Sequence, residues 1–233
     1  MPDPVYVVAG NRPWSRRVFD DVIRAYPGRW HFIGAPEQLT SDALRALEPR
    51  YVFFLHWSWK VPPEIVEAFE CVNMHMAAVP YGRGGSPLQH LIAGGHKRTK
   101  LSALRMTREL DGGPVYLQEE LALEGSAEAI YLRATELAAQ MIRRIINDQP
   151  TPVPQQGEVV MFKRRSPDQS RLPTLPSPET LYDFIRMLDA DGYPRAFIES
   201  SGFRFEFSQA VLHPDRVDAA VTITRTGDRR AVP

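Results

Sequence analysis

Asn73 and His75 stand two positions apart at the end of the apolar run "CVNMH" (71–75), just before a loop rich in proline and glycine, "AAVPYGRGGSP" (77–87). Residues two apart on an extended strand point to the same side of a sheet. An amide can donate a hydrogen bond to an oxygen that becomes negative during acyl transfer, and an imidazole can accept or return a proton near neutral pH. The pair therefore predicts acyl-transfer chemistry.

Asp111 is the third candidate, because it precedes Gly112 and Gly113, which let the backbone bend sharply or approach a ligand closely. Its carboxylate can orient an imidazole and stabilise the charged ring. No serine or cysteine nucleophile is needed if the attacking group belongs to the substrate. We expect no metal site, because His-rich or Cys-rich ligand spacing is absent from the sequence. An Asn-x-His pair or an Asp-Gly-Gly turn is often incidental, so the argument depends on their combination.

The elements expected around these residues alternate between strands and helices. Apolar runs predict strands at 5–9, 31–35, 51–57 and 71–75, and helical spacing predicts helices at 14–25, 41–49 and 62–69. Further on we expect a helix at 86–95, strands at 100–107 and 114–123, and a long helix at 126–146. This order predicts an α/β fold with a Rossmann-like, mostly parallel sheet and helices on both faces. Ligands bind beyond the carboxyl ends of such strands, where Asn73 and His75 stand.

The composition changes near residue 150, and we divide the chain into a catalytic domain at 1–150 and a smaller part at 151–233. The polar, proline-rich segment 147–158 is predicted to be a linker. A helix at 177–188 and a β-hairpin of strands 203–212 and 217–224 would form a small C-terminal unit. The hairpin carries three phenylalanines on one face, which makes it a candidate surface for a homodimer.

The bulk composition narrows the class of protein. The 233 residues carry 28 lysines and arginines and 28 aspartates and glutamates, so nothing indicates a nucleic-acid or membrane-surface partner. The single cysteine, Cys71, cannot form an internal disulfide and is expected to be a buried hydrophobe in a reducing compartment. No stretch of about 18 apolar residues and no signal pattern is present, so we expect a cytoplasmic protein with no membrane span.

The order of the motifs resembles the formyltransferases that use 10-formyltetrahydrofolate. The stretch "NMHMAAVPYGRGGSP" is followed by "ELDGGPV", and the family pattern is Asn-x-His, Leu-Pro, Arg-Gly-x-x-Pro and Asp-x-Gly-x-Ile/Val. The resemblance covers residues 5–146. The matching positions are Asn73, His75, Pro80, Arg83, Gly84, Pro87, Asp111, Gly113 and Val115.

The resemblance implies that Asn73, His75 and Asp111 are catalytic and that a substrate amine attacks the formyl carbon directly. It also implies two groups of folate contacts, one after the third strand and one before the Asp-Gly-Gly turn. These are Ser58, Trp59 and Val61, then Thr107, Arg108, Glu109, Leu110 and Asp111. The chain departs from the family at Ala77, where a serine is common, and at Lys100, where a glycine is common.

The acceptor is narrowed by comparison within the family. Glycinamide ribonucleotide enzymes carry a glycine-rich loop where this chain has "AGNRPWSRR" (9–17), and initiator-tRNA enzymes carry a longer C-terminal barrel with a basic surface. The segments 181–198 and 96–117 are similar to the short enzymes that formylate nucleotide-linked amino sugars of the pseudaminic-acid type. We expect a UDP- or dTDP-linked 4-amino-deoxy sugar.

Three residues are predicted to bind this acceptor. Arg12 would lie near the diphosphate, although it could equally be a solvated residue at a helix start, and Arg83 and Gly84 would contact the substrate. Two alternatives stay open: formylation of an amino acid such as hydroxyornithine, and a catalytically silent folate-binding domain.

Overall fold

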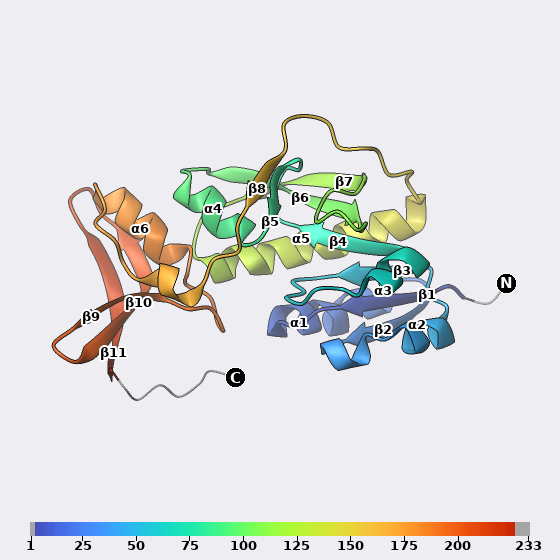
Figure 1. Cartoon of the computed structure of the whole chain (residues 1–233), viewed down its shortest axis with the longest axis horizontal. Helices are drawn as coiled ribbons and strands as arrows, with labels where there is room; N and C mark the ends of the chain where they lie inside the picture. The colour runs from blue at the N-terminus through green and yellow to red at the C-terminus, as the bar shows by residue number, and fades with distance from the viewer. Residues whose placement is uncertain (1–2, 227–233) are drawn as a thin grey trace. The chain divides into compact units, whose positions relative to one another are not determined.

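A six-stranded sheet with the strand order β2-β1-β3-β4-β6-β7 organises most of the chain (Figure 1). The structure is a computed structural model that describes residues 3–226. β1 pairs in parallel with both β2 and β3, β3 pairs in parallel with β4, and β6 runs antiparallel to β4. The predicted mostly parallel sheet is therefore confirmed. The strands are β1 (Val5–Ala9), β2 (Arg29–Ile33), β3 (Tyr51–Phe54), β4 (Cys71–His75), β6 (Arg98–Arg105) and β7 (Val115–Ala122).

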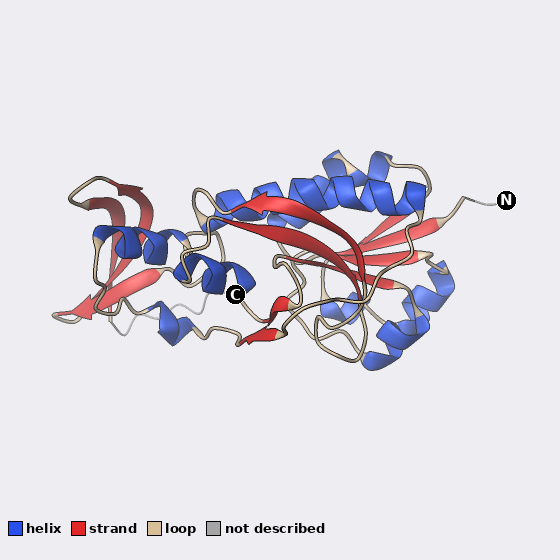
Figure 2. Cartoon of the chain, turned by 90° about the horizontal axis from the view of Figure 1, so that it is seen from above, coloured by secondary structure: helices blue, strands red, loops and turns tan. Residues whose placement is uncertain are grey.

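Helices lie on both sides of this sheet, and the long helix α5 (Ala127–Asp148) runs along one of them (Figure 2). Ser126 caps α5, since its hydroxyl accepts a hydrogen bond from the backbone N–H of Ala129 at 3.2 Å. The cap of α2 is Thr40, one residue before the helix begins at Ser41. The other helical elements are α1 (Pro13–Asp21), η1 (Ile23–Ala25), η2 (Pro36–Gln38), α2 (Ser41–Leu47) and α3 (Pro63–Ala68).

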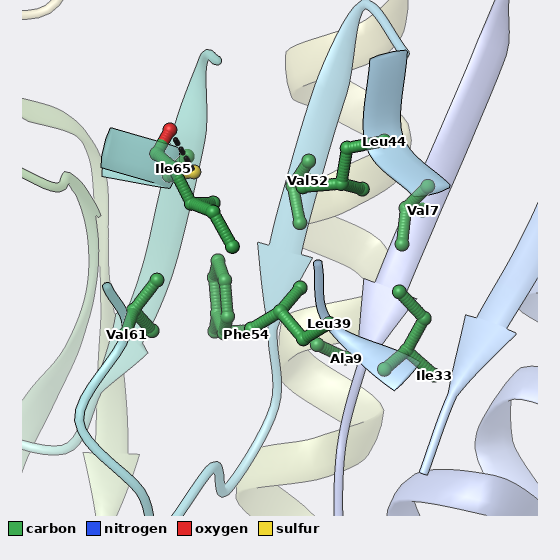
Figure 3. Close-up of a cluster of buried hydrophobic side chains, with 10 residues drawn as sticks. Val7, Ala9, Ile33, Leu39, Leu44, Val52, Phe54, Val61 and Ile65 are labelled. Carbon is green, nitrogen blue, oxygen red and sulfur yellow. Dashed lines mark hydrogen bonds between the residues drawn. The ribbon is translucent and has the colours of Figure 1, made fainter. Parts of the chain in front are cut away.

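Alternate side chains of β1 and β3 pack against helices α2 and α3 on one face of the sheet. Val7 and Val52 are fully buried and belong to one apolar cluster with Leu44 of α2 and Ile65 of α3 (Figure 3). Cys71 packs in the same cluster, as the sequence predicted for a small hydrophobe. The cluster fixes β3 and β4 against α2 and α3, and so it fixes the strand that carries the candidate site.

The described chain forms two compact units. The first takes residues up to 84, 99–121 and 132–161, and the second takes 85–98, 122–131 and the residues from 162 onward. The second unit contains α4 (Pro87–Ala93), η3 (Pro167–Ser170), α6 (Pro178–Arg186), β9 (Ala196–Ser200), β10 (Phe203–Leu212) and β11 (Val217–Arg225). β10 and β11 pair antiparallel as predicted, and β9 extends them to a three-stranded sheet that the sequence did not predict.

The segment 147–158, which we call the connector, is held to the first unit. Val153 and Val115 exchange both backbone hydrogen bonds, at 2.8 and 2.9 Å, and the N–H of Val160 donates to the carbonyl of Pro80 at 3.2 Å. β8 (Val160–Phe162) then pairs with β5 (Tyr81–Gly84), which is the Gly-rich loop after β4. The connector thus returns to the loop that follows Asn73 and His75. Within residues 3–226, the helices are too short or too polar to cross a lipid bilayer.

Candidate active site

Asn73, His75 and Asp111 converge on one point, as the sequence predicted, although they come from positions 38 apart in the chain. The amide Nδ2 of Asn73 donates to Oδ1 of Asp111 at 3.0 Å. Oδ2 of the same carboxylate lies 3.6 Å from Nδ1 of His75. The His75 side chain is 6% exposed and that of Asp111 is 9% exposed, so water screens this contact weakly.

Both ring nitrogens of His75 face oxygen atoms. Nδ1 faces the carboxylate of Asp111, and Nε2 lies 2.8 Å from the carbonyl oxygen of Gly82. Oxygen atoms on both sides therefore hold the ring of His75 in one orientation beside Asp111.

The loop that carries Asp111 is shaped for close approach. Asp111 has φ 50, a left-handed conformation that aspartate tolerates better than most side chains. A Cβ on Gly113 would lie 1.8 Å from the carbonyl oxygen of Arg105, so only glycine fits there. The backbone N–H of Gly84 donates to Oδ2 of Asp111 at 3.0 Å. Each carboxylate oxygen thus accepts one hydrogen bond, and the charge is held at a fixed place beside His75.

Two substrate-binding candidates have structural partners within the site. The guanidinium of Arg83 is buried, with its side chain 8% exposed, and its Nη1 donates to Oε1 of Glu109 at 2.6 Å. Gly84 contacts the carboxylate of Asp111 as described. Arg12 is the residue before α1 and lies at the carboxyl end of β1, the same edge of the sheet as His75. Their role in binding an acceptor stays a prediction.

The residues predicted to contact folate after β3 have different surroundings. The hydroxyl of Ser58 and the side chain of Asn11 are hydrogen-bonded at 3.2 Å. Trp59 is 43% exposed, and its ring lies 5.0 Å from that of Trp57 in an edge contact. Val61 is buried in the hydrophobic cluster, so only its backbone can meet a ligand.

The second predicted group of folate contacts lies on the loop between β6 and Asp111. Thr107 is exposed, and its hydroxyl donates a hydrogen bond to the carbonyl of Glu109 at 3.2 Å. Arg108 forms an exposed ion pair with Glu67. Leu110 is 62% exposed, although it is apolar. The loop therefore presents its side chains outward, next to the carboxylate of Asp111.

His56, two residues after the end of β3, is held by its neighbours. It has φ 52, and its Nε2 is 2.8 Å from the hydroxyl of Thr135. Removal from water, and secondarily the positive charge of Arg12, lower the pKa of His56 to about 4. His56 is therefore neutral near pH 7 and is not a source of protons for the reaction.

Two groups at the site escaped the sequence analysis. One is the carbonyl of Gly82, which binds His75 and has no sequence signature because every residue has a carbonyl. The other is Gln155 of the connector, whose amide binds the Asp111 loop. Its position depends on where the connector returns, and the local sequence does not encode that.

The comparisons with known proteins identify the family of this chain. The model of the formyl transferase family matches residues 23–146, which is more than half of the chain. The chain belongs to the formyl transferase family. This family transfers formyl groups from 10-formyltetrahydrofolate. A second model, described as the C-terminal domain of methionyl-tRNA formyltransferase, matches residues 167–224.

Individual members of the formyl transferase family differ in name. A methionyl-tRNA formyltransferase from Thermodesulfovibrio yellowstonii is 26% identical over 163 residues, covering 65% of this chain and 53% of the relative. The chain thus spans about half the length of the curated relatives it matches. The structure named methionyl-tRNA formyltransferase from Clostridium thermocellum is 37% identical with a TM-score of 0.90, covering 95% of this chain and 99% of that one.

A structure described as a likely sugar N-formyltransferase, Rv3404c from Mycobacterium tuberculosis, is 19% identical with a TM-score of 0.71. The match covers 92% of this chain and 99% of the Mycobacterium tuberculosis chain, and it shows that the two share a fold.

Proposed function

We propose that this protein transfers the formyl group of 10-formyltetrahydrofolate to the amine of a nucleotide-linked 4-amino-deoxy sugar. The observation that carries the reaction is the contact of one carboxylate, that of Asp111, with both Asn73 and His75. An amide can donate to an oxygen that gains negative charge, and an imidazole and a carboxylate can move the proton that the amine loses.

Each of the three residues has a distinct task in this proposal. When bound, 10-formyltetrahydrofolate supplies an electrophilic formyl carbon to the amine. The Asn73 amide has two hydrogens, and the one that does not bind Asp111 donates to the formyl oxygen as that oxygen gains negative charge. The imidazole of His75, which lies against the same carboxylate, also stabilises that oxygen. Asp111 orients the ring of His75 and receives the proton that the amine loses, directly or through water. As the amine nitrogen bonds to the formyl carbon, the bond from that carbon to N10 of the folate would break, and tetrahydrofolate would leave with a proton on N10.

The charge of the C-terminal segment supports a small acceptor over a transfer RNA. Residues 167–224, which match the C-terminal domain of methionyl-tRNA formyltransferase, contain five arginines, no lysine and nine aspartates and glutamates. All five arginines form ion pairs with carboxylates of this segment: Arg171 with Glu199, Arg186 with Asp183, Arg195 with Asp189, Arg204 with Glu199 and Glu206, and Arg216 with Asp215 and Asp218. Binding RNA phosphates needs an excess of positive charge, which this segment lacks.

Methionyl-tRNA is the second candidate acceptor. It is favoured by the 37% identity to the Clostridium thermocellum protein, which carries that name and has nearly the same length as this chain. The acidic C-terminal segment makes it the weaker of the two candidates.

A panel of amines tests the proposal. The protein is incubated with 10-formyltetrahydrofolate and, in separate reactions, with UDP- and dTDP-linked 4-amino-deoxy sugars, hydroxyornithine and methionyl-tRNA, and each product is weighed by mass spectrometry. We expect one formyl group to be added to a nucleotide sugar. Formylation of methionyl-tRNA or of the amino acid alone would replace the proposed acceptor, and formylation of none of the panel would favour a silent folate-binding domain.

A further inference from the structure

Gln155 lies in the connector, 44 positions after Asp111, and its side chain reaches the Asp111 loop. Nε2 donates to the carbonyl of Asp111 at 2.8 Å and to the carbonyl of Gly113 at 2.7 Å. Oε1 accepts from Nε of Arg83 at 2.9 Å. Both amide hydrogens and the amide oxygen are therefore in use, and the turn Asp111–Gly113 curls around a single NH2 group.

This contact acts on the backbone that aims the carboxylate. Asp111 has a left-handed φ of 50, and a residue other than glycine keeps this conformation only where the surrounding structure holds its backbone. Its two oxygens must reach Asn73 Nδ2 and Gly84 N at once, each at 3.0 Å. A rotation of the Asp111 peptide would move both oxygens away from these donors and from His75.

Gln155 is itself held in place from both sides. The connector is anchored before it by the paired backbone hydrogen bonds of Val153 with Val115, and after it by the bond from Val160 to Pro80. Arg83 ties the same amide to the preceding part of the loop, because its Nη1 binds Glu109. Arg83, Gln155 and the loop 109–113 thus form a closed set of polar contacts around the carboxylate.

We propose that Gln155 is a positioning residue for formyl transfer: it fixes the backbone of Asp111 so that the carboxylate meets Asn73 and His75. The inference rests on the proposed role of Asp111. The task needs an amide at this chain length, because glutamate has no donors for the two carbonyls and asparagine is one methylene shorter. Methionine matches the length but makes neither hydrogen bond.

The first test is kinetic and uses Gln155→Met and Gln155→Ala, with Gln156→Ala as the matched control, since Gln156 is the exposed neighbour of the same type. We expect kcat at saturating concentrations of both substrates to fall roughly 10- to 100-fold in both variants, the size typical of a misplaced catalytic group. The control should keep wild-type kcat. Circular dichroism checks that each variant is folded.

A double-mutant cycle separates positioning from general stability. If Gln155 acts through Asp111, then Gln155→Met should lower kcat by less than about threefold in an Asp111→Asn background, because the two losses are not additive for coupled groups. The same loss in both backgrounds, or wild-type kcat in Gln155→Met, would overturn the proposal.

A spectroscopic test does not depend on turnover. The ring nitrogens of His75 are observed by NMR in protein labelled with 15N-histidine, after assignment with His75→Gln. We expect Gln155→Met and Asp111→Asn to move the His75 signals in the same direction and Gln156→Ala to leave them in place. Unmoved His75 signals in Gln155→Met contradict the proposal. If the wild type is inactive in the formylation assay but the variants show the expected shifts, the result counts against the proposed function alone.

Discussion

Replacing Asp111 by asparagine preserves the size of the side chain but changes what its two terminal atoms can do. In the wild type, Oδ1 accepts from Asn73 and Oδ2 accepts from the N–H of Gly84, both at 3.0 Å. An asparagine has one oxygen and one NH2 group. In either orientation, the NH2 group therefore faces one of these two donors, and the negative charge beside His75 is lost.

The expected magnitudes follow from these contacts. Leaving one buried donor without an acceptor costs about 1–3 kcal/mol of folding free energy. That cost corresponds to a fall in melting temperature of roughly 2–12 °C for a chain of this size, so the fold should persist. A unit charge about 4 Å from a charged ring contributes about 4 kcal/mol at an effective dielectric constant of ~20. Loss of about 3–4 kcal/mol from the transition state lowers the rate roughly 10²- to 10³-fold.

The assay is the initial rate of formyl transfer against pH, from 10-formyltetrahydrofolate to the acceptor found in the panel. We expect Asp111→Asn to lower kcat/KM by at least about 100-fold and to change the shape of the pH–rate profile, because the carboxylate that faces the His75 ring is gone. A variant within threefold of the wild-type rate, with an unchanged profile, would refute the role given to Asp111.

Other predictions concern the site and two buried groups away from it. Asn73→Ala and His75→Ala should each lower turnover by roughly a hundredfold or more, through loss of an oxyanion donor or a proton-transfer group; near-wild-type turnover in the formylation assay would remove that residue from the mechanism. The native state holds His56 neutral with a pKa of about 4, so the unfolded state takes up the proton first and stability falls as the pH drops from about 6.5 towards 4. The variant His56→Asn, whose asparagine tolerates the positive φ, should lose this pH dependence of the free energy of unfolding. The difference is about 2 kcal/mol between pH 7 and 5, measured by urea unfolding, and an equal pH dependence in both proteins contradicts the environment described for His56. Burial raises the pKa of the Cys71 thiol to about 12, so a thiol reagent at pH 8 should modify it only after denaturation, and rapid labelling of the native protein would show the cluster to be open.

The sequence predicted the elements of the central sheet because their signals are local. β1 and β4 are short apolar runs and were predicted with the bounds that the structure gives them. β9 was missed because "AFIES" is short and buries only Ala196 and Phe197, and it depends on pairing with β10. β5 was missed because "YGRG" contains two glycines and has no strand preference of its own; its partner β8 follows the connector.

The candidate site divides in the same way between local and distant signals. Asn73 and His75 were predicted from their spacing on a strand, and Asp111 from the two glycines after it. The contacts of Gln155 and of the Gly82 carbonyl are set by how the connector and the loop after β4 fold back. Gln155 supplies an amide wherever the chain places it, but only the tertiary fold brings that amide beside the turn at Asp111.

The central claim is that Asn73, His75 and Asp111 together carry formyl transfer to an amine. The most direct test is the mass of a nucleotide-linked 4-amino-deoxy sugar after incubation with 10-formyltetrahydrofolate and either the wild-type protein or His75→Ala. The account predicts a single added formyl group with the wild type and almost none with the variant. Equal formylation by both proteins would contradict it.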